Sequence, residues 1–405
     1  MLGVKNPEQA IKILKDECRM ELACERVCLK DALGRILAQD IKAEEFVPGF
    51  DRSTVDGYAV IASDTFGCSQ SSPSMLKMTG DVIMGQESEA RIFRGSCMYV
   101  PTGGMLPQGA DCVVMIEYVS DMGDGYMCVE KPAAPGQNVI FRGDDTTPED
   151  TVLRRGIALS PADIGVLAAV GCAEVPVTRR PRLGIVSTGD EIISVENTPK
   201  GSQVRDVNSW VISAAATEFG CEPLMLGIIR DDFESLKGCA ERALEECDML
   251  VISGGSSVGA RDMTVRVIES MSGAHMLFHG IAVKPGKPTI AALVRGKPVI
   301  GLPGHPVSAY FIFRIFVRSA IEASLGIEYS RRRALATLSQ TLPSNHGREE
   351  YVPVKITWTG CGYEAVPVTG KSGLITQLSG ADGYIKIERD CEGVSRGAQV
   401  EAFWL

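Results

Sequence analysis

Apolar and polar positions alternate on two length scales between residues 182 and 321. Runs of strand length, such as LMLGIIRDD and DMLVISGGSSVGARD, are separated by segments of helix length, such as VNSWVISAAATEFG and FESLKGCAERALEEC. Apolar strands that alternate with helices are typical of a parallel sheet with helices on both faces. Such sheets bind ligands at the carboxyl ends of their strands, which here read STGDE, RDD, SGGSSVGARD and GLPGHP. We expect these four ends to converge in space.

The rest of the chain follows other patterns. Asn6 caps a predicted helix that runs to about Cys18, and further helices are expected at 29–36 and 161–170. Short strand-like runs separated by Gly, Pro and Ser fill residues 45–137, and similar runs follow Arg333. The fold class expected is therefore a multidomain α/β and β protein. We expect helical or connecting segments at 1–45 and 141–178, a β-rich domain (46–140), a central parallel α/β/α domain (179–328) and a C-terminal β-barrel (329–405).

Charge and cysteine usage narrow the possible partners and compartment. The 405 residues carry a formal net charge of -10, and no basic run is longer than Arg331–Arg333, which argues against nucleic acid. The 13 cysteines include no CxxC pair; Cys24 and Cys28 are placed four apart on an expected helix and interpreted as reduced thiols. Neither a signal peptide nor an apolar run of membrane-spanning length occurs. We therefore expect a cytoplasmic protein with no membrane association.

A glycine turn follows one buried strand. Backbone N–H groups at Gly254 and Gly255 could approach an anion, with Ser256, Ser257 and Asp262 beside them. The Lys and Ser/Thr of a Walker A loop are missing, so an ordinary P-loop ATPase is not expected. A tight structural turn is the alternative interpretation of the glycines.

The segment VKPGKP holds two lysines on a stretch that its prolines stiffen. Lys284 and Lys287 lie three residues apart, and two fixed cations beside a glycine turn suit phosphate or another oxyanion. Solvated surface lysines are the alternative.

Carboxylates gather at the expected strand ends. They belong to Asp190, Glu191, Asp206, Asp231 and Asp232. Together they could form a Mg²⁺ site that keeps most of its waters, although Asp206 and Asp232 also stand where helix caps belong.

The histidines give weaker signals. His275 and His279 lie on an expected strand, where residues four apart are too distant to share a metal ion. His305, in LPGHP, is either a turn residue or a ligand contact.

One polar stretch of the β-rich region raises a separate question. FDRSTVDGYAV brings Asp51, Arg52, Ser53 and Asp56 together just before a strand-like run. These residues form either a solvated turn or one half of a binding site.

Seven motifs in order resemble one family over nearly the whole chain. STVDGYAV, PTGGMLPQGADCVVM, FRGDD, STGDE, GGSSVGARD, VKPGKP and GLPGHPVSA are similar to those of the MoeA-type molybdopterin molybdenumtransferases, which are related to the gephyrin E domain. The resemblance implies an elongated homodimer with an active site shared between subunits, in which 1–45 and 141–178 form one discontinuous helical linking domain. The implied reaction requires Mg²⁺, transfers molybdenum from molybdate to adenylylated molybdopterin and releases AMP. The resemblance departs at Val55 and His305, where many relatives have Met and Asn.

The resemblance also implies site residues. The catalytic ones are Asp56, Glu191, Lys284 and Lys287, and Glu191, Asp206 and Asp262 are the implied metal ligands. Substrate contacts are implied for Thr102, Asp145, Asp206, Asp231, Asp232, Gly254, Gly255, Ser256, Ser257, Asp262, Pro303, His305, Pro306, Ser308, Arg348 and Ser372. Partners could include the molybdopterin adenylyltransferase and molybdoenzyme-maturation proteins. A molybdopterin adenylyltransferase, a tungsten insertase and a non-catalytic scaffold are the alternatives.

Overall fold

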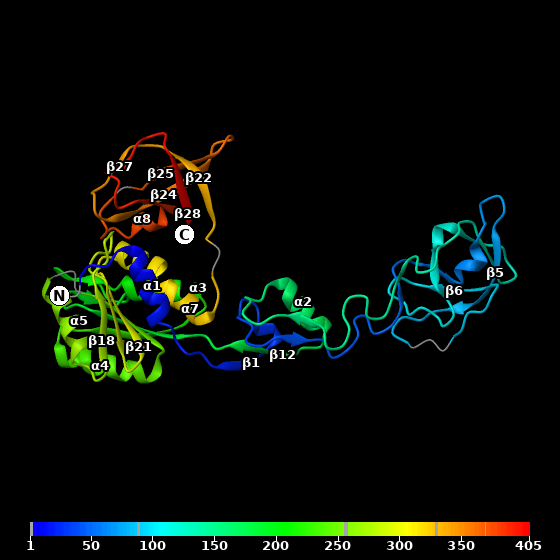
Figure 1. The fold of residues 1–405 in the computed structure, drawn as a ribbon, viewed down its shortest axis with the longest axis horizontal. Helices are drawn as coiled ribbons and strands as arrows, with labels where there is room; N and C mark the ends of the chain where they lie inside the picture. Colours follow the sequence, from blue (N-terminus) through cyan, green and yellow to red (C-terminus); the bar gives the residue numbers. More distant parts are fainter. Residues whose placement is uncertain (1–2, 87–89, 255–257, 329–330, 369) are drawn as a thin grey trace.

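The molecule is elongated, with its two β-rich ends far apart. The computed structural model describes residues 3–86, 90–254, 258–328, 331–368 and 370–405, with the side chains of 258–262 left out. An α/β domain and a β-barrel lie together at one end, a slender linking region extends from them, and a β-rich domain forms the other end (Figure 1). None of the helices in these ranges is long and apolar enough to cross a membrane.

A six-stranded sheet forms the centre of the α/β domain. Its order is β16-β13-β17-β21-β20-β18. The strands are β16 (Glu222–Ile229), β13 (Arg182–Thr188), β17 (Met249–Gly254), β21 (Lys297–Leu302), β20 (Ile290–Val294) and β18 (Ala274–His279). The first four are parallel, as expected, but β20 is antiparallel to both of its neighbours, β21 and β18. Because Val294 pairs with Lys297, only Arg295 and Gly296 form the turn, and both have positive φ. Such a two-residue turn joins only antiparallel strands, so the sheet is mixed.

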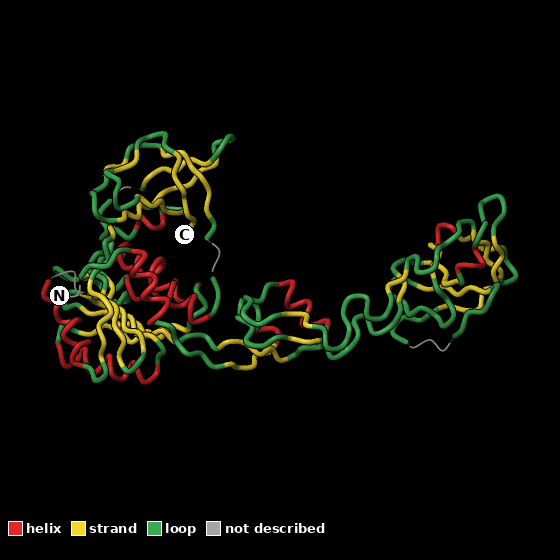
Figure 2. The backbone as a smooth tube through the Cα atoms, viewed as in Figure 1, coloured by secondary structure: helices red, strands yellow, loops and turns green. Residues whose placement is uncertain are grey.

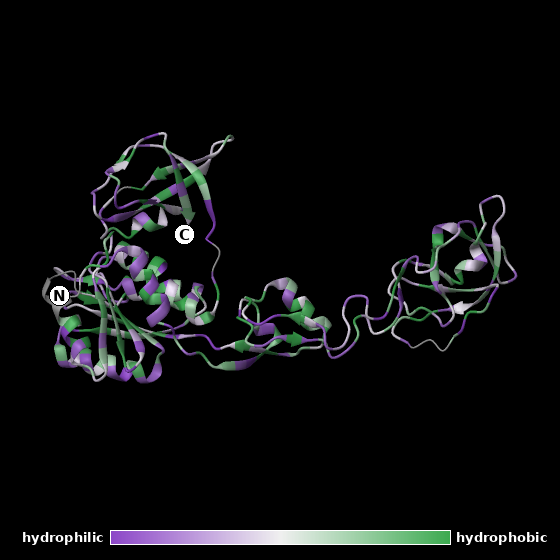
Figure 3. Ribbon diagram, in the orientation of Figure 1, coloured by the Kyte–Doolittle hydropathy of each residue, from purple (hydrophilic) through white to green (hydrophobic). Residues whose placement is uncertain are grey.

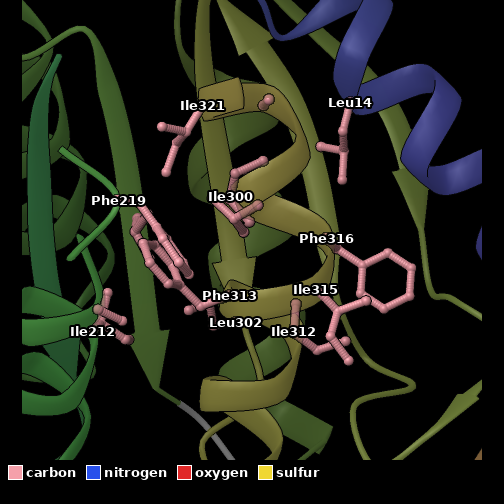
Figure 4. Packing of buried hydrophobic residues seen from close by; sticks show 14 of the residues in the cluster. Leu14, Ile212, Phe219, Ile300, Leu302, Ile312, Phe313, Ile315, Phe316 and Ile321 are labelled. Atoms are coloured by element: carbon pink, nitrogen blue, oxygen red, sulfur yellow. The ribbon is translucent and has the colours of Figure 1, made fainter. Parts of the chain in front are cut away.

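Each face of this sheet is covered by its own apolar core. Successive residues of β17 point to opposite faces, so Val251 packs into one core while Leu250 and Ile252 pack into the other. One face is covered by α4 (Phe233–Glu246) and α5 (Val258–Ser270). The opposite face is covered by α3 (Asn208–Glu218), α6 (Pro306–Ile312), the π-helical η4 (Phe313–Val317) and α7 (Arg318–Leu325). Figure 4 shows this second core, in which Phe219 lies against Phe313.

The first helix packs onto the α/β domain. Helix α1 (Pro7–Glu17) begins with the expected capping box, in which the Asn6 side chain accepts from the Gln9 N–H. Its Leu14 is buried in the same core as α7 (Figure 4). The chain thus starts at the α/β domain and returns to it only at β13.

Two strand pairs and one helix form the linking region. Strand β1 (Cys24–Cys28) pairs with β12 (Glu174–Thr178), and β2 (Ile41–Lys42) pairs with β11 (Thr151–Leu153). Helix α2 (Pro161–Ala169) confirms one expected helix. The helix expected through Cys24 and Cys28 is wrong, because this segment pairs with β12 over all five residues. The helix expected at 29–36 is only a single turn at Leu29–Asp31.

A twisted six-stranded sheet makes up the β-rich domain. Its order is β7-β4-β6-β5-β9-β8. The strands are β4 (Gly57–Val60), β5 (Ser74–Asp81), β6 (Ser96–Val100), β7 (Cys112–Met115), β8 (Val119–Asp121) and β9 (Tyr126–Val129). Apolar side chains on both sides of this sheet form two small cores, and the strand-rich nature of the domain is visible in Figure 2.

The C-terminal barrel closes on itself and also pairs with the α/β domain. It contains β22 (Arg333–Leu338), β24 (Glu349–Trp358), β25 (Tyr363–Pro367), β26 (Gly383–Ile387) and β28 (Gln399–Trp404), and the β24–β26 pairing closes it. A sixth strand, β19 (Val283–Lys284), comes from the α/β domain and pairs in parallel with the start of β24. The barrel interior is apolar while its exposed turns are polar (Figure 3). The two domains are therefore joined through backbone hydrogen bonds.

The placement of α1 gives a stability prediction. Leu14→Ala should lower the free energy of unfolding of the α/β domain by about 2–5 kcal/mol, because Leu14 is only 1% exposed and its loss leaves a cavity. Leu33→Ala, at a position that is 56% exposed, is the matched control and should change stability by less than about 0.5 kcal/mol. Denaturant unfolding followed by circular dichroism measures both. Equal effects of the two substitutions would contradict the assignment of α1 to this core.

Candidate functional site

A cavity of about 750 Å³ lies between the α/β domain and the barrel. The α/β domain contributes residues 283–288, 303–305 and 307–308 to its lining, and the barrel contributes 342–343, 348, 350–353, 368, 370–372 and 377. Of the sequence-predicted residues, it brings together Lys284, Lys287, Pro303, His305, Ser308, Arg348 and Ser372. Segments that are distant in sequence thus meet here. Of the four strand ends that were expected to converge, GLPGHP alone contributes described residues to this lining, and the other segments are the VKPGKP turn and parts of the barrel.

The two lysines stand on a tight turn at the cavity wall. Lys284 and Lys287 are both exposed. Between them Gly286 has φ +111°, and a Cβ there would lie 2.5 Å from Ile312 side-chain carbons of α6. Only glycine fits this position, so the turn carries the lysines close against the helix.

The second wall begins where β21 ends. His305 precedes α6 as its N-cap residue, Pro306 starts the helix and Ser308 is buried in its first turn. The His305 Nδ1 atom lies 2.9 Å from the Ser372 Oγ atom of the barrel, and the Val307 N–H donates to the Ser372 carbonyl. His305 is therefore both a turn residue and a contact between the two domains.

The barrel adds three side chains that sequence reasoning missed. Glu350, Lys371 and Gln377 line the cavity with Arg348 and Ser372. Glu350 follows Arg348 closely in GREEY and could have been noticed from that spacing, whereas Lys371 has no local signal beyond GKSG. Among the described residues of the lining, four side chains are cationic and one is a carboxylate. The cavity therefore favours an anion.

The strand-end carboxylates serve first as structural acceptors. Asp206 Oδ1 accepts hydrogen bonds from the Ser187 hydroxyl and the Ser209 N–H at the start of α3. Asp231 accepts from the Thr188 hydroxyl at 2.7 Å.

Asp232 is the N-cap residue of α4. Its side chain accepts from the Ser235 N–H at the start of α4, and the hydrogen bonds of Ser235 hold the pKa of Asp232 below its usual value. Capping is thus confirmed as a role of Asp232.

Exposed carboxylates remain at the same edge of the sheet. Asp190 and Glu191 follow β13 and are exposed, and Asp190 Oδ1 lies 3.4 Å from the Asp231 backbone nitrogen. Among the described residues, no three His, Cys, Asp or Glu side chains are close enough to hold a metal ion together. The side chain of Asp262 lies outside the described part of the chain, as do Gly255, Ser256 and Ser257.

Gly254 has a packing role that the structure makes clear. It pairs with Thr188 of β13, and a Cβ on Gly254 would lie 2.1 Å from the Thr188 carbonyl oxygen. Close strand approach alone therefore requires glycine here. Nearby, the Asn208 amide donates to the Ser253 hydroxyl and to the Gly304 carbonyl, which ties this strand end to the loop after β21.

The predicted residues of the β-rich half lie elsewhere. Asp56 accepts from the Thr102 N–H at 2.7 Å and from its hydroxyl at 3.0 Å, and these hydrogen bonds hold the pKa of Asp56 below its usual value. Asp145 is exposed, and its N–H donates to the Val47 carbonyl. The domain that carries β4 and β6 lies at the opposite end of the molecule from the cavity (Figure 1). Within one chain, Asp56 and Thr102 do not reach the lysines.

The fold and the cavity define a multidomain protein with a mixed α/β domain at its centre and a cavity lined by four cationic side chains at its contact with the barrel. Three family models cover the chain in order: the MoeA N-terminal region (domains I and II) over residues 5–171, a probable molybdopterin binding domain over 184–323 and the MoeA C-terminal region (domain IV) over 336–405. The chain belongs to the MoeA family.

Individual relatives agree with this assignment. The chain is 31% identical over 412 residues to the molybdopterin molybdenumtransferase of Bacillus subtilis, covering 100% of this chain and 96% of that protein. Two crystal structures of molybdopterin biosynthesis MoeA proteins from Pyrococcus horikoshii superpose with TM-scores of 0.87 and 0.85, at 37% and 32% identity. They cover 99% and 100% of both chains. The fold class expected from the sequence is confirmed.

Lys371 supplies a test of the cavity as an anion site. Lys371→Gln should weaken the binding of molybdate about 5-fold, because one of four cations is removed from the lining. Lys355→Gln is the matched control, since Lys355 is exposed on β24 and is not among the lining residues. Isothermal titration at low ionic strength measures both affinities, and added salt should reduce the difference. Equal affinities for Lys371→Gln and the control would argue against Lys371 as an anion contact.

Proposed function

We propose that this chain is a molybdopterin molybdenumtransferase of molybdenum cofactor biosynthesis. It takes adenylylated molybdopterin and molybdate, cleaves the phosphoanhydride with release of AMP and leaves molybdenum on the dithiolene. The observation that carries the proposal is the cavity lined by Lys284, Lys287, Arg348 and Lys371, together with membership of the MoeA family. The substrates suit this lining, because molybdate is a tetrahedral oxyanion and the adenylylated pterin carries a pyrophosphate.

Each wall of the cavity has its own part in the chemistry. Lys284 and Lys287 stabilise negative charge on the oxyanion or the terminal phosphate, and fixed cations lose little energy to reorganisation when charge develops. The buried Ser308 hydroxyl and the Ser372 hydroxyl are placed to contact oxyanion oxygens. The barrel therefore supplies part of the substrate contact surface.

Mg²⁺ would be held by carboxylate oxygens at the neighbouring strand ends. Glu191, Asp206 and Asp262 form an all-oxygen donor set, which suits Mg²⁺, and an ion that keeps most of its waters needs few protein ligands. Glu191 is exposed, whereas Asp206 already accepts two hydrogen bonds at Oδ1. We therefore infer that, of Glu191 and Asp206, it is Glu191 that provides the direct contact. When bound, the ion neutralises charge on the phosphoanhydride.

The separation of Asp56 from the cavity supports a shared site. We infer that the chain works as a homodimer in which Asp56 and Thr102 of one subunit complete the site of the other. The hydrogen bonds from Thr102 orient the Asp56 carboxylate and hold its pKa below its usual value. A charged, oriented carboxylate on an exposed loop is suited to contact a partner or a substrate.

The main alternative activity is adenylylation of molybdopterin. The family model over residues 184–323 describes a molybdopterin-binding domain and does not by itself separate the two reactions. The MoeA N-terminal and C-terminal regions favour transfer of molybdenum. Molybdate and tungstate have nearly the same size and shape, so both are candidate oxyanions.

A product analysis tests the reaction. The purified protein, incubated with adenylylated molybdopterin, Mg²⁺ and molybdate, should release AMP and yield a pterin whose mass includes molybdenum. Omission of molybdate is the control for simple hydrolysis, and parallel reactions with tungstate compare the two oxyanions. Adenylylation of free molybdopterin from Mg-ATP, with no metal insertion, would show that the alternative activity is correct.

A mixing experiment tests the shared site. Asp56→Ala and Lys287→Ala should each fold normally but lower the insertion rate at least 100-fold, because each removes a charged group from the site. After subunit exchange, random pairing makes half of the dimers mixed, each with one intact site, so about a quarter of wild-type activity should return. Mass spectrometry of intact dimers verifies the exchange. Mixed dimers without activity would contradict a site built from both subunits.

A further inference from the structure

The only carboxylate among the described lining residues of the cavity is held in one place. Glu350 lies opposite Lys284 in the parallel pairing of β24 with β19, and the Glu349 N–H donates to the Ala282 carbonyl next to it. Residues that are paired in register on neighbouring strands present their side chains on the same face. The backbone therefore places this carboxylate and the Lys284 ammonium side by side.

Both carboxylate oxygens of Glu350 have partners. Oε1 lies 2.8 Å from the Lys284 ammonium, and Oε2 accepts from the Ser344 hydroxyl at 2.8 Å. The Glu350 side chain is 13% exposed, while that of Lys284 is 47% exposed. The carboxylate is thus the anchored member of the pair, and the lysine is the member that reaches the cavity.

This carboxylate opposes the binding of any anion. A negative charge inside a cavity for oxyanions lowers their affinity, and the effect is larger where water is partly excluded. Arg348 and Lys371, by contrast, form no ion pair within the described part of the chain, so their charges are available to an incoming anion. Glu350 therefore weakens binding, and its direct effect falls on Lys284 alone.

We propose that Glu350 is a positioning residue that fixes the Lys284 ammonium for the reaction while it lowers the affinity of the cavity for oxyanions. The proposal rests on the proposed function. Preorganised charge speeds a reaction only when its position is fixed, so an unpaired Lys284 would bind the oxyanion more tightly but stabilise the developing charge less well.

The test separates affinity from rate. In Glu350→Gln, molybdate should bind about 5-fold more tightly by isothermal titration, because a repelling charge is gone. The rate constant for insertion at saturating substrates should fall about 10-fold, since Lys284 is no longer held. Glu401→Gln is the matched control: it removes a barrel carboxylate that pairs with Arg333 on the surface, and it should change neither value.

A labelling experiment tests whether Glu350 holds Lys284, and it does not depend on the insertion reaction. Acetic anhydride modifies free amines, and an ammonium held by a carboxylate is protected. Peptide mass analysis should show Lys284 acetylated less than Lys287 in the wild-type protein and several-fold more in Glu350→Gln. Absence of insertion by the wild-type protein would refute the proposed function, whereas the labelling ratio and the molybdate affinity would still decide the role of Glu350.

Defined results would overturn the proposal. Unchanged Lys284 labelling, weaker molybdate binding or an unchanged insertion rate in folded Glu350→Gln would each do so. If thermal unfolding shows that Glu350→Gln does not fold, Ser344→Ala takes its place, because it removes the partner of Oε2 and leaves the charge. Ser344→Ala should then raise Lys284 labelling and lower the insertion rate, and no change in either would overturn the proposal.

Discussion

The parallel pairing of β19 with β24 is the contact on which the functional part of the structure depends. It makes a two-residue segment of the α/β domain into a strand of the barrel sheet, so backbone hydrogen bonds set the position of one domain against the other. An aromatic cluster stabilises the same interface: Phe311 of α6 stacks on Tyr351 of β24 and meets Tyr384 of β26 edge-on. Burial raises the pKa of Tyr351, whose hydroxyl donates to Glu349. The cavity is held between two domains that are fixed by both polar and apolar contacts.

The cavity walls of the α/β domain are short segments that are stiffened by their contact with α6. The turn with Gly286 presses against Ile312 of α6, and the loop after β21 leads directly into the same helix. Both cavity walls of the α/β domain are therefore supported by one helix, which continues into η4 and α7 within the main core. A side chain on such a support loses little freedom when a ligand binds, so charge can be preorganised there.

The elements that could be predicted from the sequence are those with local signals, and the errors lie where a strand pairs with a distant part of the chain. The caps at Asn6 and Asp232 and the helices at 161–169 and 233–246 follow from signals within a few residues of each other. The strand at Cys24–Cys28 was mistaken for a helix, because its partner β12 lies about 150 residues away and tertiary pairing overrides weak local preference. The reversed strand β20 does have a local signal, because the two-residue turn at Arg295 and Gly296 can join only antiparallel strands.

The candidate site shows the same division. Lys284, Lys287 and His305 stand in rigid motifs that could be noticed one at a time, and the structure brings them together. Glu350 has a local signal only in its spacing from Arg348, and Lys371 has none; the closure of the barrel against α6 carries both to the cavity wall. Asp56 presents the opposite case: its hydrogen bonds with Thr102 give an ordered, charged group, but the linking region keeps it far from the cavity of its own chain. A slender linking region between the β-rich domain and the cavity is useful if the Asp56 loop serves the cavity of a second subunit. The geometry of one chain therefore supports the proposed homodimer.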